Sequence, residues 1–169
     1  MALVWVRAAG RLLLGMSRTF WAGVAGLWAG LIWWLSTHEG GTGDGTFWMM
    51  WLGNLAHAPL FGLLALWLAL AAPRRAVGGW ARLSRLDRTW IFVAVAAWGA
   101  MDEVHQSFVP GRDASVLDLM TDSAGALSVL AVAATAGLAS ASAVGVRRRL
   151  GLGILACLLT ALSATLGSM

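Results

Sequence analysis

The sequence predicts an all-α bundle of membrane-spanning helices with a cytoplasmic N-terminus, and its composition and hydropathy pattern carry this prediction. Hydrophobic residues make up 59% of the 169 positions and charged residues only 12%, whereas a typical soluble domain has about 25% charged residues. The apolar residues gather in runs of the ~20 residues that an α-helix needs to cross the hydrocarbon of a bilayer. The chain is therefore expected to be a polytopic membrane protein.

Five apolar segments are each long enough to span a membrane, and short polar or glycine-rich stretches separate them. The predicted spans cover residues 19–36, 47–72, 89–108, 115–141 and 150–168. Residues 19–168 then form a single transmembrane domain, preceded by a basic segment over residues 1–18. The first span resembles a signal peptide, but a poor cleavage site and four further spans identify it as a retained anchor.

The arginines predict the orientation of these spans. The chain has twelve arginines and no lysine, and eleven of the arginines precede span 1, lie between spans 2 and 3, or lie between spans 4 and 5. Only Arg112 falls on the other side. Under the positive-inside rule this places the N-terminus in the cytoplasm and the C-terminus outside, in a bacterial inner membrane. This placement also explains the net charge of +4 better than a nucleic-acid partner does.

The N-terminal segment has two interpretations. In a continuous helix, Arg7, Arg11 and Arg18 would lie within about 40° of one another. This spacing fits an amphipathic helix lying on the inner leaflet. A short disordered basic tail is the alternative.

Polar residues concentrate where spans 3 and 4 meet. Because the connection between these spans is short, they must form an antiparallel hairpin that gathers its polar groups near the outer surface. Ionisable groups inside a span are costly and mark functional sites. Asp102 and Gln106 are four residues apart on one helical face, and Gly125 would let a neighbouring helix approach closely. The polar positions of the hairpin are Asp102, Glu103, His105, Gln106, Ser115, Asp118 and Asp122.

Span 2 adds Asn54 and His57, which are followed by Pro59. Pro59 offers no N–H to the carbonyl of Leu55, so a kink is expected there. His57 is either a structural hydrogen-bonding group or lies opposite the acidic residues of spans 3 and 4.

The four carboxylates and two histidines have three chemical interpretations. They can ligate a divalent metal, although their spacing matches no recognised metal motif. Two carboxylates can instead share a proton and act as acid and base. The third interpretation is a hydrogen-bonded polar plug neutralised by Arg112. An excess of acids over basic residues counts against the plug, because an unbalanced buried negative cluster needs protons, a metal or a cationic ligand.

Arg112 has two interpretations of its own. It can pair with Asp113, Asp118 or Asp102 and so clasp the hairpin. It can also hold a phosphate or carboxylate in a bidentate contact at the membrane surface. As the only outer basic residue, Arg112 is our first candidate for contact with an anionic headgroup.

The hairpin resembles the signature of the VanZ-like family. The resemblance rests on Asp102-Glu103-x-x-Gln106-x-Phe108-x-Pro110-x-Arg112, followed by Ser115, Asp118 and Gly125, and on a histidine-bearing earlier span with a leucine-rich run. It implies a membrane protein of four or five helices with a role in the cell envelope. The founding member of that family is associated with low-level resistance to the glycopeptide teicoplanin.

Three positions depart from the pattern of the family. Asp122 stands where the family usually has asparagine, and Gly53-Asn54 stands where many members have Asp-Lys. His105 is not a fixed part of the pattern. The ligand of this chain is therefore expected to differ from that of the founding member.

Two classes of function follow. In the first, the protein binds an amphiphilic anionic ligand at the outer leaflet: a lipid-linked cell-wall precursor, a phospholipid or a lipoglycopeptide. Arg112 would hold the head, with Gln106, Asn54, Ser115 and Asp122 as further binding residues. In the second, it is a membrane hydrolase or transferase acting on a lipid-linked phosphate. Its catalytic candidates are Asp102, Glu103, His57, His105 and Asp118.

A proton-coupled transporter and a packing partner in a larger complex are further alternatives. The absence of a visible inverted repeat argues against a transporter. Assembly as a homo-oligomer would make a transporter possible again.

Overall fold

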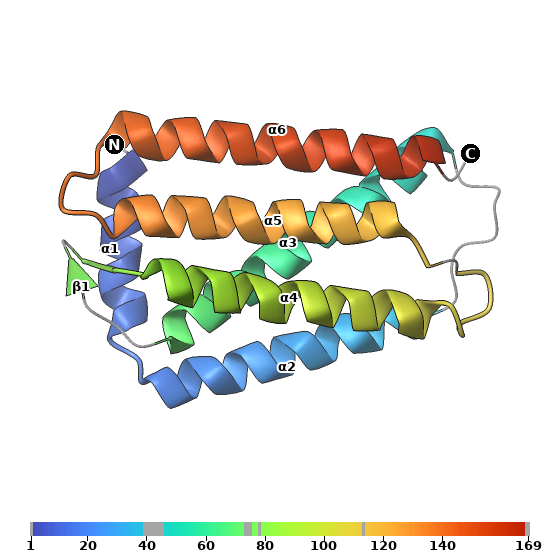
Figure 1. Cartoon of the computed structure of the whole chain (residues 1–169), viewed down its shortest axis with the longest axis horizontal. Coiled ribbons are helices and arrows are strands. Elements are labelled where there is room, and N and C mark those ends of the chain that lie inside the picture. The colour runs from blue at the N-terminus through green and yellow to red at the C-terminus, as the bar shows by residue number, and fades with distance from the viewer. Residues whose placement is uncertain (1, 39–45, 73–75, 78, 113, 168–169) are drawn as a thin grey trace.

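The computed structural model describes residues 2–38, 46–72, 76–77, 79–112 and 114–167. It is an all-α bundle of six helices with one short β-hairpin among these residues (Figure 1). The helices are α1 (Ala2–Leu14), α2 (Arg18–Ser36), α3 (Phe47–Ala71), α4 (Arg85–Gln106), α5 (Val116–Ala136) and α6 (Ala143–Gly167). The strands β1 (Ala76–Val77) and β2 (Trp80–Ala81) pair antiparallel. The predicted fold class is confirmed.

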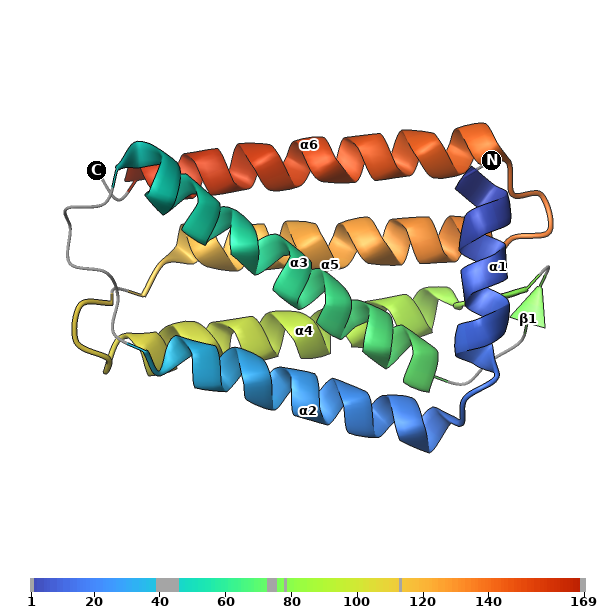
Figure 2. The ribbon, with the colours of Figure 1, turned by 180° about the vertical axis from the view of Figure 1, so that it is seen from behind.

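The long helices lie lengthwise in the bundle. Figure 1 shows α2, α4, α5 and α6 along the long axis, and Figure 2 shows α3 crossing them diagonally. Four described helices, α2, α3, α5 and α6, are long and apolar enough to cross a membrane. The remaining predicted span, 89–108, lies largely in α4, which has a similar length but carries several polar residues in its last turns. All five predicted spans are therefore helices of the bundle.

The helix bounds differ from the prediction at both sides of the α5–α6 connection. α5 ends at Ala136, with Gly137 as its C-cap, rather than at residue 141. α6 begins at Ala143, so the three consecutive arginines 147–149 lie inside its first turns. The Oγ of Ser142 accepts a hydrogen bond from the N–H of Gly145, which satisfies a donor at the start of this helix. The hydropathy pattern missed this helix start because hydropathy reports apolar residues and contains no information on backbone capping.

The N-terminal segment is a helix, so the interpretation as a disordered tail is wrong. α1 lies across one end of the bundle, beside β1 (Figure 2). Arg7 donates hydrogen bonds to the carbonyls of Ala136 and Leu138 at the end of α5. Arg18 does not share the α1 face as predicted. Ser17 caps a new helix there, and Arg18 is the first residue of α2.

We call the end that carries α1 and the two β-strands the α1 end. We call the opposite end the hairpin end, after the helical hairpin of α4 and α5, whose connection lies there (Figure 1). α4 and α5 are antiparallel neighbours, as the short connection predicted. Ser84 and Asp87 form a capping box that begins α4 at the α1 end. Ser115 caps the start of α5 at the hairpin end.

Close approach of α3 and α5 forms the centre of the bundle. A Cβ placed on Gly125 of α5 would overlap the backbone of Ala58 on α3. This confirms the predicted role of Gly125. At Gly62 of α3, a Cβ would lie 3.3 Å from the carbonyl oxygen of Gly125. The small residues let the backbones meet, which membrane helices use in place of the hydrophobic effect.

Replacing Gly125 with leucine is expected to separate α3 from α5. Overpacking of this kind costs about 1–3 kcal/mol, so the free energy of unfolding should fall by that amount. Gly151→Leu on α6 is the matched control, because a Cβ there meets nothing within 4 Å. Thermal unfolding in detergent, followed by circular dichroism, measures both variants. Equal stability of the two variants would contradict the close packing.

Candidate functional site

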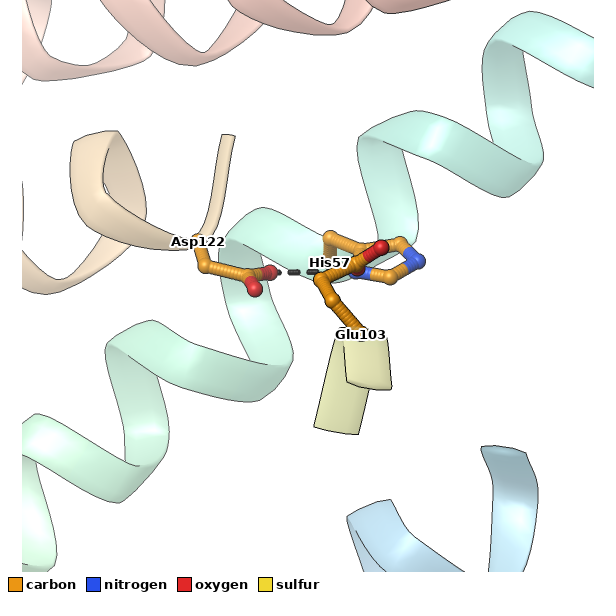
Figure 3. A group of neighbouring side chains, drawn as sticks. All are labelled: His57, Glu103 and Asp122. Atoms are coloured by element: carbon orange, nitrogen blue, oxygen red, sulfur yellow. Dashed lines mark hydrogen bonds and ion pairs between the residues drawn. The ribbon is translucent and has the colours of Figure 1, made fainter. Parts of the chain in front are cut away.

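Three ionisable side chains from three helices meet near the hairpin end. His57 lies on α3, Glu103 on α4 and Asp122 on α5. Nδ1 of His57 is 3.0 Å from Oδ1 of Asp122. One ligand atom from each of the three residues lies within 4.8 Å of the other two (Figure 3). We call these three residues the triad. The structure thus places His57 opposite an acidic residue of span 4, one of its two predicted positions.

Packing against the neighbouring helices orients the triad. The ring of Phe61, one turn after His57, lies parallel to the imidazole with ring centroids 6.3 Å apart. Gly99, one turn before Glu103, leaves room for Asp122, because a Cβ there would lie 2.9 Å from Oδ2 of Asp122. Asp122 is only 1% exposed and Glu103 6%. Both carboxylates are therefore held away from solvent.

The start of α5 supports the triad through its backbone. The N–H of Ser115 donates to Oε2 of Glu103 at 2.6 Å. The Oγ of Ser115 accepts from the N–H of Asp118 at 3.2 Å, so this residue also caps the helix. His57 interacts electrostatically with Asp118 as well as with the two carboxylates of the triad. Asp118 is therefore an acidic neighbour of the triad.

Asp102 belongs to a second polar cluster that faces α2. Its Oδ1 accepts from the Oγ of Ser36 at 2.6 Å, and its Oδ2 accepts from Nε2 of Gln106 at 2.8 Å. Nη1 of Arg112 donates to Oε1 of Gln106 at 3.4 Å, and its Nε donates to the carbonyl of His38 at 3.3 Å. We call Ser36, Asp102, Gln106 and Arg112 the clasp. It links the α4–α5 connection to the end of α2.

Successive helical residues point about 100° apart, so Asp102 and Glu103 face different neighbours. Both oxygens of Asp102 have hydrogen-bond donors, whereas Oε1 of Glu103, Oδ2 of Asp122 and Oδ1 of Asp118 have no partner among the described residues. The structure thus separates a satisfied carboxylate from a group with free acceptor atoms.

Two further predicted site residues, Asn54 and His105, belong to neither the triad nor the clasp. Asn54 donates from Nδ2 to Oγ1 of Thr165 at 3.0 Å and so joins α3 to α6. His105 stacks on Trp33 of α2 with ring centroids 4.0 Å apart. Arg112 forms no ion pair with Asp102 or Asp118, and Asp113 lies outside the described residues.

Sequence reasoning missed Ser36, Trp33, Phe61 and Gly99 at the site. Ser36 is a polar residue at the end of span 1, and only this position could have indicated that it belongs to the site. Trp33 and Phe61 lie in apolar runs where aromatic residues are common. Gly99 precedes Glu103 by one turn, so it shares the face of α4 against which Asp122 packs.

An apolar groove lies along α3, α5 and α6 and reaches α1. It has a volume of about 700 Å³ and is lined by α1, α3, α5, α6 and Trp80. Ala58 and Pro59, which follow His57, line it, as does Gly125, three residues after Asp122. α1 bounds it through Val6, Ala9 and Leu13. We call it the apolar groove. The triad and this hydrocarbon-sized space therefore share α3 and α5.

The chemistry available at the triad is that of carboxylate and imidazole. These groups hold a divalent metal, transfer protons or receive a cationic group. His57, Glu103 and Asp122 are the described residues that lie close enough to share one metal ion.

Comparison with known proteins gives one match. No curated protein and no solved structure matches the chain. The family model described as VanZ/LLP1 matches residues 13–137, from the end of α1 to the end of α5. The match includes the triad, the clasp, and α3 and α5, which are two of the four helices that line the apolar groove. The chain therefore belongs to the VanZ-like family.

Proposed function

We propose that this membrane protein acts in the cell envelope by binding an anionic amphiphile at the outer leaflet, in a role linked to antibiotic resistance. The observation that carries the proposal is that the polar site and the apolar groove share two helices. His57 and Asp122 of the triad lie on α3 and α5, and other residues of the same two helices line the groove. An amphiphile needs a polar and an apolar environment on one protein.

The apolar groove suits a hydrocarbon tail. Its volume of about 700 Å³ falls within the roughly 300–1,000 Å³ of ordinary ligand sites. Its lining is almost entirely apolar, with Ser128 and Cys157 as small exceptions. Because three of the helices around it are long and apolar enough to span a membrane, acyl chains are the surrounding solvent and the natural occupants.

Arg112 suits the anionic head of the ligand. It lies at the hairpin end, and its two hydrogen bonds are long and go to neutral oxygens, at 3.3 and 3.4 Å. Among the described residues no carboxylate forms an ion pair with it. Because these two hydrogen bonds are long, the planar guanidinium can take a phosphate or carboxylate in a bidentate contact. The distribution of the arginines supports an extracytoplasmic position for this end.

Native mass spectrometry from nanodiscs of phosphatidylglycerol tests the proposal. Wild-type protein should retain lipid, and Arg112→Ala should lower retention roughly tenfold, the equivalent of about 1.4 kcal/mol. Arg149→Ala, at the α1 end, is the matched control and should retain lipid like the wild type. Equal retention by Arg112→Ala and Arg149→Ala would overturn the role of Arg112.

A photoreactive lipid locates the tail. Phosphatidylglycerol with a diazirine in its acyl chain should label peptides of α3, α5 and α6 that line the apolar groove. Alkylation of Cys157, the only cysteine of the chain, should slow when lipid is bound. Labelling spread evenly over all lipid-facing helices, with unchanged alkylation of Cys157, would contradict occupancy of the groove.

The free acceptor atoms of Glu103 and Asp122 favour a second candidate, a hydrolase or transferase acting on a lipid-linked phosphate. Here the carboxylates would take part in acid–base chemistry. Glu103→Gln should then abolish release of phosphate from a polyprenyl diphosphate in nanodiscs. In the binding function the same variant should keep its lipid. An active Glu103→Gln protein would eliminate Glu103 as the acid–base residue, and an inactive wild type would eliminate the hydrolase.

A further inference from the structure

We propose that His57, Glu103 and Asp122 form a binding site for one divalent transition-metal ion. The inference goes beyond the proposed function, because it concerns the triad alone and holds whether or not an amphiphile binds. Each ligand comes from a different helix, so the ion would cross-link α3, α4 and α5 near the hairpin end.

The distances fit a shared ion. Metal ligands of this kind bind at roughly 2.0–2.2 Å, which places neighbouring ligand atoms about 3–4 Å apart. The three ligand atoms already lie within 4.8 Å of one another. Small rotations of the Glu103 and Asp122 side chains therefore bring them into coordination. Figure 3 shows the three side chains reaching the same region from separate ribbons.

The unsatisfied carboxylate atoms are the second observation. Oε1 of Glu103 and Oδ2 of Asp122 have no hydrogen-bond partner among the described residues, although both side chains are more than nine-tenths buried. A buried carboxylate oxygen without a partner costs free energy. A divalent cation satisfies both oxygens and balances the two negative charges. The bond between His57 and Asp122 alone balances only one.

The ligand set decides the class of metal. Imidazole suits Zn²⁺, Fe²⁺ and Ni²⁺, and carboxylates suit Mn²⁺ and Mg²⁺. A mixed set of one imidazole and two carboxylates favours Zn²⁺ or Mn²⁺ over Ca²⁺, which prefers oxygen ligands alone. The hydrogen bond from the Ser115 N–H to Glu103 orients one ligand, as outer-shell partners do in metal sites.

The clasp offers a contrast on the same helix. Asp102 is as deeply buried as Asp122 but has a donor for each oxygen. His105 is stacked on Trp33 and lies outside the group that can share an ion. Asp102→Asn and His105→Gln are therefore matched controls for Glu103→Gln and His57→Gln.

The experiment measures metal content and affinity in purified full-length protein. After incubation with Zn²⁺ or Mn²⁺ and removal of excess ion, elemental analysis should find one ion per chain. Glu103→Gln, Asp122→Asn and His57→Gln should weaken binding by roughly tenfold or more, the loss typical of disturbed metal sites. Asp102→Asn and His105→Gln should bind like the wild type. Absence of a bound ion in the wild type, or equal losses in the controls, would overturn the proposal.

A spectroscopic measurement on the wild type keeps the test independent of variant folding. Electron spin echo modulation of bound Mn²⁺ should show coupling to one imidazole nitrogen. An ion without nitrogen coupling would exclude His57 as a ligand and overturn the site. Lipid retention is measured separately, so failure of the metal site and failure of amphiphile binding are distinguishable.

Discussion

His57→Leu should destabilise the bundle by about 3–5 kcal/mol, the cost of removing one partner from a buried ion pair. Asp122 is 1% exposed, and its hydrogen bond from His57 at 3.0 Å is the one the structure describes for its side chain. Without His57 the carboxylate is buried with no donor and must be neutralised or resolvated. The free energy of unfolding in detergent, from chemical denaturation of metal-free protein, measures this loss.

The double variant His57→Leu/Asp122→Leu separates the effect of the ion pair on stability from the effect of side-chain volume. Replacing both partners of a buried pair with apolar residues is often neutral or stabilising. The double variant should therefore regain most of the stability lost in His57→Leu. His105→Leu is the control, because that ring contributes a stacking contact with Trp33 and no ion pair. Asp122→Leu is measured singly as well. If the stability losses of His57→Leu and Asp122→Leu simply added in the double variant, the pair would have no role of its own.

Hydropathy and helical periodicity predicted most of the fold. The five predicted apolar segments lie in helices of the structure, and α4 and α5 form the antiparallel hairpin that their short connection predicted. Gly125 was expected to allow close approach, and α3 meets it there. These features depend on local composition, which a single sequence displays. The start of α6 was missed because its first turns carry arginines, which lower hydropathy without breaking a helix.

The candidate site was predicted as a gathering of residues but not as two clusters. Periodicity says which residues share a face of one helix, and it correctly paired Asp102 with Gln106. It cannot say which helix faces them. The rotation of α4 turns Asp102 toward Ser36 and Glu103 toward His57, so consecutive residues serve separate clusters. The same limit hid the stacking of His105 on Trp33 and the bond between Asn54 and Thr165.

Reporter fusions should give an all-or-none answer on the orientation of the bundle. Alkaline phosphatase needs disulfides and is active only outside the cytoplasm. Fused after Met169 it should be active, and inserted after Leu83, between α3 and α4, it should be inactive. Activity is measured in whole cells and normalised to the amount of fusion protein on an immunoblot.

The structure gives this expectation its physical basis. The described arginines other than Arg112 lie in α1, at the starts of α2, α4 and α6, or just after β2, which gather at the α1 end (Figures 1 and 2). Arg112 lies at the hairpin end with the triad. Positive charge near span ends holds that side in the cytoplasm, so the triad and clasp should face outward. The reverse pattern of activity would place the polar site inside the cell and remove the outer leaflet as the source of its ligand.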